Sequence, residues 1–264
     1  MGGPDHGILL TVAYDGERFS GWASQVGQAG VRTVEDTLRA AIASMDPGAS
    51  PPRGASRTDA GVHAEGQVAA FDPSRTIEPR GWVLGLDAAL PDDVAVRAAR
   101  QVPAFFEPRA AARGKRYRYR LLLDPVRDPL LRGRAWRVGH PLDLDRMKRE
   151  ASRLEGTHDF RAFRSAKDER ENTTRTLGRV AIERESERVV GIVVEGTAFL
   201  HNMVRILAGT LVDVARGQLD EGAVTRAIAS GKRDDLGATA PAHGLVLERV
   251  ELAGLDDGGA AWPR

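Results

Sequence analysis

Runs of β-forming residues alternate with amphipathic helical segments along this chain, and that order limits the possible folds more than any other feature of the sequence. In the first part, strand patterns lie at residues 8–14, 68–71 and 94–98, and helix patterns lie at 34–45 and 79–90. Thr33 precedes the first helix pattern, where its hydroxyl can cap the helix. The order β, α, β, α, β predicts an α+β arrangement with helices packed on a sheet.

The second part of the chain repeats this plan with different segment lengths. Its strand patterns lie at residues 116–123, 175–183, 188–195 and 245–252, and its helix patterns lie at 143–154, 199–216 and 221–229. With 264 residues, the chain is long enough for one large domain or two modest ones. We therefore expect two α+β halves, residues 1–110 and 111–264.

The residue types exclude several kinds of chemistry. The chain has no cysteine, which rules out disulfides, thiolate metal sites and cysteine nucleophiles. Its six histidines are scattered, without a pair at the spacing of metal ligands on a helix. We expect no metal site, so any chemistry in this protein uses groups other than thiols and metals.

The net charge is close to zero, but the basic residues are unusual. The 38 basic residues oppose 37 acidic ones and give a net charge of +1. Only four of the basic residues are lysines, so 34 are arginines. The planar guanidinium suits phosphate, guanine and carboxylate. The arginine excess fits either a nucleic-acid partner or a GC-rich genome, and composition does not separate the two.

No segment of the sequence predicts a membrane anchor or a targeting signal. The first seven residues lack a basic patch followed by an apolar run. The longest apolar stretch, residues 199–215, is interrupted by His201, Arg205 and Asp213. We expect a soluble, cytoplasmic protein without a membrane partner.

A glycine-rich segment at residues 54–67 places Arg57, Asp59 and His63 within seven positions. Glycines allow tight turns and a close approach of the backbone to a ligand, so these side chains can be presented at a cleft. The alternative is an ordinary Asp-Ala-Gly turn in which Arg57 pairs with Asp59. Spacing alone leaves both interpretations open.

Arg205 lies in the middle of the most apolar helix pattern of the chain, at residues 199–216. A buried arginine without a partner costs several kcal/mol, so the pattern predicts that a carboxylate pairs with Arg205. Such a pair would keep the carboxylate ionised and oriented. The alternative is that Arg205 reaches solvent along a polar edge with His201 and Asn202.

The segment KRYRYRLLL at residues 115–123 alternates as a strand does. One face carries Tyr117 and Tyr119, and the other carries Arg116, Arg118 and Arg120. Tyrosines that stack on bases, interleaved with arginines that hold phosphates, are typical of nucleic-acid binding. A half-buried strand with a solvated arginine face explains the same pattern.

The segment RTDAGVHA at residues 57–64 resembles the active-site motif of the tRNA pseudouridine synthase A family. Other matches follow in order along nearly the whole chain: Tyr14-Asp-Gly, Gly21-Trp22, Arg97, residues 115–119, Asp159-Phe160 with Phe163, residues 199–210 and residues 241–245. The resemblance implies the pseudouridine synthase fold, in which two ferredoxin-like α/β halves share one extended, mostly antiparallel sheet.

The resemblance also implies an activity, which is isomerisation of uridine to pseudouridine at positions 38, 39 and 40 in the anticodon arm of tRNA. Asp59 would be the nucleophile, Arg205 would pair with it, and Arg57 would help to flip the base out of the helix. Tyr117 would stack on the flipped uracil. The other expected substrate-binding residues are His63, Arg116 and Arg118. The family works as a homodimer, with tRNA as its partner and with no metal or organic cofactor.

Two other functions fit parts of the sequence. A non-catalytic RNA-binding protein would need only the strand of tyrosines and arginines. Asp59 argues against it, because a pure binder has no use for a carboxylate beside phosphates. A glycosidase would need two matched carboxylates, and the sequence offers one.

Overall fold

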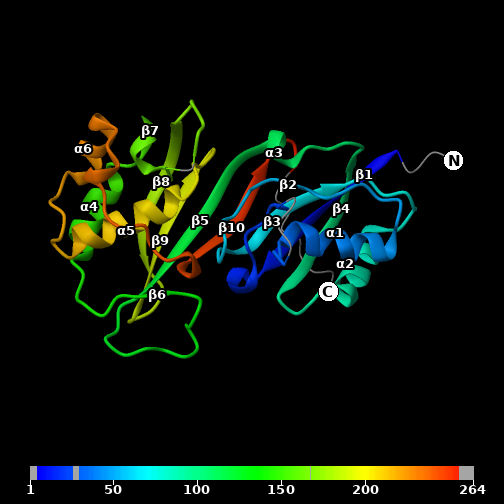
Figure 1. Ribbon diagram of the computed structural model, residues 1–264, viewed down its shortest axis with the longest axis horizontal. Coiled ribbons are helices and arrows are strands. Elements are labelled where there is room, and N and C mark those ends of the chain that lie inside the picture. Colours follow the sequence, from blue (N-terminus) through cyan, green and yellow to red (C-terminus); the bar gives the residue numbers. More distant parts are fainter. Residues whose placement is uncertain (1–4, 26–29, 167, 256–264) are drawn as a thin grey trace. The chain divides into compact units, whose positions relative to one another are not determined.

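The computed structural model describes residues 5–25, 30–166 and 168–255 (Figure 1). The chain forms two compact units. The first contains the described residues up to Arg113 together with those from Leu247 onward, and the second is Gly114–Val246. Because the borders fall within two strands, β5 (Ala112–Leu122) and β10 (Leu245–Leu252), both strands belong in part to each unit.

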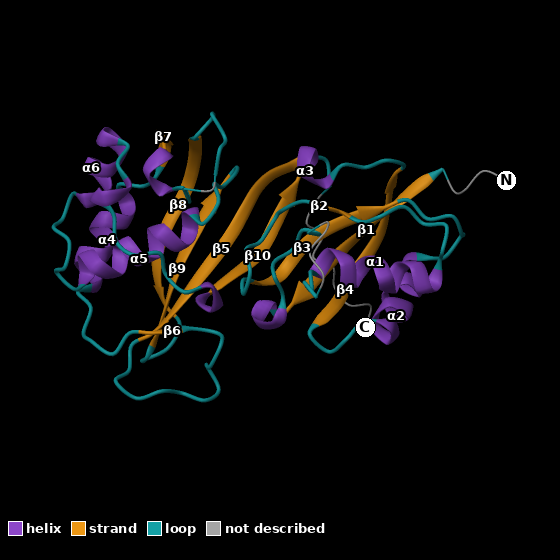
Figure 2. Ribbon diagram, in the orientation of Figure 1, coloured by secondary structure: helices purple, strands orange, loops and turns teal. Residues whose placement is uncertain are grey.

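The first unit is a sheet with helices packed against it (Figure 2). The strands are β1 (His6–Tyr14), β2 (Arg53–Gly54), β3 (His63–Phe71) and β4 (Val94–Pro103). The sheet has the order β4-β1-β3-β10, and β1 pairs antiparallel with both of its neighbours. The short β2 lies off this path and pairs antiparallel with β3. The helices are α1 (Val34–Met45), α2 (Pro79–Ala89) and the short α3 (Pro108–Ala111). The helix α2 packs on β4 and on α1.

The core of this unit comes from the apolar stripes seen in the sequence. Alternate residues Ile8 and Leu10 of β1 are fully buried, as are Leu38 of α1 and Trp82 of α2. The expected cap of α1 is confirmed, because the Thr33 side chain accepts a hydrogen bond from the Asp36 amide.

The second unit is also a sheet with helices against it. The strands β7 (Gly156–Asp159), β8 (Thr174–Arg184) and β9 (Val189–Gly196) continue from β5 in the order β5-β9-β8-β7, all antiparallel. The short β6 (Trp136–Arg137) runs parallel to β5. The helices are α4 (Leu144–Ser152), α5 (Met203–Ala215) and α6 (Ala223–Ser230), and α4 packs on β8 and on α5.

The longest predicted helix is shorter than the sequence pattern indicates. The expected helix at residues 199–216 begins at Met203, because Asn202 adopts a left-handed backbone with φ of 62°. Asparagine tolerates that conformation better than most residues. Every residue of α5 except Arg205 and Asp213 is buried, as the apolar pattern predicts. No helix among the described residues is both long and apolar enough to cross a bilayer.

Candidate active site

The motif loop, residues 55–62, connects β2 to β3 in the first unit. Within it, the Val62 amide donates to the Asp59 carbonyl at 3.1 Å and closes a turn around residues 59–62. Arg57 is exposed and Asp59 is half-buried. The loop therefore carries a carboxylate at a partly shielded position and a cation beside it in solvent.

Thr58 anchors the loop immediately before Asp59. Its hydroxyl and the Tyr14 hydroxyl form a hydrogen bond of 2.7 Å, and both side chains are buried. Its carbonyl accepts from the Trp22 amide at 3.1 Å. Gly21 makes this approach feasible, since its φ is 98° and a Cβ there would lie 2.7 Å from the Thr58 carbonyl oxygen. Tyr14, Gly21 and Trp22, which are among the matches to the family, thus fix the position of Thr58, the residue before Asp59.

The two ends of the motif loop are anchored as well. Buried Gln67 donates to the Ser56 carbonyl at 2.7 Å and accepts from the Ser56 amide at 3.2 Å. At the other end, the Gly16 amide donates to Nδ1 of buried His63 at 3.0 Å. A Cβ on Gly16 would lie 2.1 Å from the Val62 carbonyl oxygen, so only glycine fits there. His63 therefore fastens the loop to the turn after β1.

Arg205 is half-buried on α5, in the second unit. Its Nε donates to the Ala240 carbonyl at 2.9 Å, and its Nη1 donates to Oδ1 of Asn202 at 2.9 Å. The contact with Asn202 agrees with the polar-edge alternative of the sequence analysis. These two bonds orient the guanidinium, whereas its pairing with Asp59 stays a prediction, because Asp59 belongs to the other unit.

The two tyrosines of β5 have different surroundings. Tyr119 is fully buried, donates to the Pro241 carbonyl at 2.7 Å and has its pKa raised far above the usual value by burial. It is a neutral core residue. Tyr117 is 6% exposed and meets the Phe199 ring edge-to-face at 5.0 Å. Tyr117 therefore lies beside the segment that leads into α5, because Phe199 comes three residues before Asn202.

Arg116 and Arg118 lie on the opposite face of β5 from Tyr117, as the alternation predicts. Arg118 pairs with Glu183 and Glu185 at 3.0 Å each, and Arg116 pairs with Glu195. Substrate binding by these two arginines stays a prediction, and any phosphate would compete with the glutamates for them.

The sequence analysis did not single out Asp168, which organises the charged segment before β8. Its buried carboxylate accepts from Nε of Arg170 at 2.7 Å and from the His201 amide at 2.9 Å. The hydrogen bond from Arg170 holds the pKa of Asp168 well below its usual value, against the opposing effect of burial. This carboxylate ties the segment to the start of α5, and no local pattern in the sequence indicates it.

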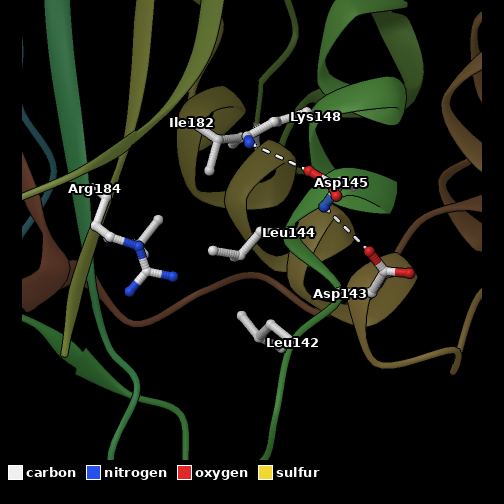
Figure 3. Close-up of a pocket in the computed structure, with 8 residues that line it drawn as sticks. Leu142, Asp143, Leu144, Asp145, Lys148, Ile182 and Arg184 are labelled. Carbon is white, nitrogen blue, oxygen red and sulfur yellow. Dashed lines mark hydrogen bonds and ion pairs between the residues drawn. The ribbon is translucent and has the colours of Figure 1, made fainter. Parts of the chain in front are cut away.

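A surface pocket of about 500 Å³ opens where α4 begins, beside β8 and β9 (Figure 3). Leu142, Leu144 and Ile182 supply apolar lining, and Lys148 pairs with Asp145 on its rim at 3.3 Å. None of the residues expected to act in catalysis or substrate binding lines this pocket. Among the described residues, no group of three potential metal ligands lies together.

Comparison with known proteins identifies the family. The family model described as tRNA pseudouridine synthase matches residues 10–109 and 151–252. A tRNA pseudouridine synthase A from Myxococcus xanthus is 45% identical over 244 residues, which cover 92% of this chain and 91% of that protein. One from Geotalea uraniireducens is 42% identical, over 92% of this chain and 98% of that protein. The resemblance seen in the sequence, the α+β fold and the enzyme class are thereby confirmed, and the chain belongs to the tRNA pseudouridine synthase family.

Proposed function

We propose that this enzyme isomerises uridine to pseudouridine in the anticodon arm of tRNA, with Asp59 as its nucleophile. The observation that carries the proposal is the anchoring of the motif loop. Hydrogen bonds to Thr58 and a closed turn at Val62 hold the backbone on both sides of Asp59. A nucleophile gains most from a fixed position, because a displacement of about 1 Å costs on the order of a hundredfold in rate.

The reaction requires few groups. The C1′–N1 bond of uridine breaks, the uracil rotates, and a C1′–C5 bond forms. The proton on C5 is released to water and N1 gains one from water, so composition and redox state are unchanged and no co-reactant is consumed. Asp59 forms the covalent intermediate and is then released, whether it attacks the uracil ring or the sugar. A single carboxylate therefore suffices for this chemistry.

The remaining roles follow from chemistry and exposure. Arg57, exposed at the loop, enters the RNA helix and takes the place of the flipped nucleotide. Tyr117 stacks on the extruded uracil, which offsets part of the few kcal/mol that flipping costs. Arg205 pairs with Asp59 and keeps it ionised. His63 keeps its expected place among the substrate-binding residues and also positions the loop, since its Nδ1 accepts a hydrogen bond from the protein backbone.

The proposal extends to the setting in which the enzyme works. The substrate positions are 38, 39 and 40 of tRNA, the enzyme is a cytoplasmic homodimer, and it needs no metal or organic cofactor. These statements rest on the resemblance of the sequence to the tRNA pseudouridine synthase A family.

Tritium release from tRNA labelled at uracil C5 tests the proposal. The wild-type enzyme is expected to release tritium and to convert uridines of the anticodon arm. Asp59→Asn, which keeps the shape of the side chain, should abolish release while tRNA binding persists. Asp87→Asn on α2, an exposed carboxylate, is the matched control and should retain activity. Folded wild-type protein that binds tRNA without releasing tritium would support the RNA-binding alternative instead.

A further inference from the structure

Phe105 combines two features that rarely occur together. It has a positive φ of 58°, one of two such values among the described residues other than glycine. The other is Asn202, a residue type that tolerates this conformation. For a bulky side chain, it is a genuine outlier. Phe105 is also 80% exposed. Of the large apolar side chains exposed in the described part of the chain, it is the one aromatic.

A network of charged groups holds the turn at Phe105 in place. The Phe105 amide donates to Oδ1 of Asp72 at 2.7 Å. Arg53 donates through Nη2 to the Phe106 carbonyl at 3.2 Å and pairs with Asp72 at 2.8 Å. It also pairs with Glu107 at 3.1 Å. The fold thus stabilises a strained backbone whose effect is to direct an aromatic ring into solvent, where it adds nothing to the core.

The surroundings of Phe105 suit a nucleobase better than a protein. A stable protein interface buries about 800 Å² on each side around an apolar centre. Among the described residues, the other exposed large apolar side chains are Leu84, Val126 and Leu130, and none of them belongs to this turn. One ring is the right size to stack on one base. The exposed arginines Arg109 and Arg113, which follow in the chain, add positive charge for the phosphates of the same strand.

The turn at Phe105 is far from Asp59 within the first unit, although the motif loop begins near that turn, because Arg53 contacts Phe106 and the Ala55 amide donates to the Val68 carbonyl. Asp72 directly follows the last residue of β3, whereas the turn at residues 59–62 directly precedes the first. The nine residues of β3 span roughly 30 Å at about 3.3 Å per residue. A folded tRNA is long enough to reach both places, so a contact at Phe105 would involve a nucleotide remote from the target uridine.

We propose that Phe105 is a stacking platform for an unpaired nucleobase of the tRNA substrate, at a second contact remote from the reacting uridine. This inference rests on the proposed function for the identity of the RNA. A remote contact contributes to binding and leaves the chemical step unchanged. Removing the ring should therefore raise Kd and KM together and leave kcat at its wild-type value.

The test compares Phe105→Asn, Phe105→Trp and the wild type. Asparagine accepts the positive φ, so Phe105→Asn should fold at least as stably as the wild type. Its tRNA Kd, measured by filter binding at fixed salt, should rise about 5- to 100-fold. Phe105→Trp keeps an aromatic face and should bind close to wild type. Leu130→Asn, which removes an apolar side chain that is 91% exposed, is the matched control and should not change Kd.

Three outcomes would overturn the stacking platform at Phe105. An unchanged Kd for folded Phe105→Asn, with wild-type protein binding and modifying tRNA, would overturn the stacking platform alone. Failure of the wild type to bind any tRNA would overturn both the platform and the proposed function. If Phe105→Asn instead changed the oligomeric state in sedimentation, Phe105 would contact a second copy of the chain, and the RNA assignment would be wrong.

Discussion

The hydrogen bond between Tyr14 and Thr58 should couple stability to catalysis. Tyr14→Phe removes one hydroxyl and leaves the Thr58 hydroxyl, in a side chain only 7% exposed, without this 2.7 Å partner. A buried hydroxyl that loses its partner costs about 1–3 kcal/mol. We expect the free energy of unfolding to fall by about that amount. Because Thr58 precedes Asp59, we also expect kcat to fall about 10- to 100-fold with little change in KM.

The assays are urea unfolding and tritium release, performed on Tyr14→Phe, Thr58→Val and the double variant. If the bond sets the position of the loop, the double variant should be little worse than either single variant, since the same interaction is lost in each. Thr58→Ser keeps the hydroxyl and should keep most of the activity. The reasoning would be refuted by a Tyr14→Phe enzyme with wild-type kcat, or by strictly additive effects in the cycle.

Two further predictions concern Asp168 in the second unit and Gly16 in the first. The lowered pKa of Asp168 means that its contacts with Arg170 stabilise the fold fully above the unfolded-state pKa of about 4, and lose that effect as pH falls through the folded pKa. Asp168→Asn should therefore lower the melting temperature at pH 7, and calorimetry should show the difference from wild type shrinking below about pH 4. Gly16→Ala would place a methyl group 2.1 Å from the Val62 carbonyl oxygen, so we expect a loss of about 1–3 kcal/mol in urea unfolding together with reduced tritium release. A fully active and stable Gly16→Ala enzyme would show that the motif loop tolerates displacement.

Local patterns predict the helices and most strands because their causes are local. The cap at Thr33 and the apolar stripe of α1 lie within one stretch of the chain, and both are as expected. The start of α5 differs by four residues, since a single left-handed residue, Asn202, overrides an apolar pattern that continues on both sides. The pairing of β10 with β3 joins distant segments, and no local pattern indicates it.

The same distinction applies to the site. The chemical residue types of the motif loop are visible in the sequence, but the anchoring of Thr58 by Tyr14 and Trp22 joins segments about 40 residues apart. The alternation of β5 predicts that Arg118 and Tyr117 lie on opposite faces. It contains no information about register, so the glutamates opposite Arg118 could be identified only from the structure.

The arginine face of β5 also affects how strongly the second unit attracts an approaching polyanion. The face combines four arginines with three glutamates: Arg116, Arg118, Arg120 and Arg179 with Glu183, Glu185 and Glu195. These seven side chains carry a net charge of only about +1, since ion pairs of about 3 Å cancel most of the field of the arginines, and beyond a Debye length of about 8 Å little of the remainder persists. This strand therefore attracts a distant RNA only weakly, despite its arginines. Long-range electrostatic attraction must come from arginines outside this group of ion pairs.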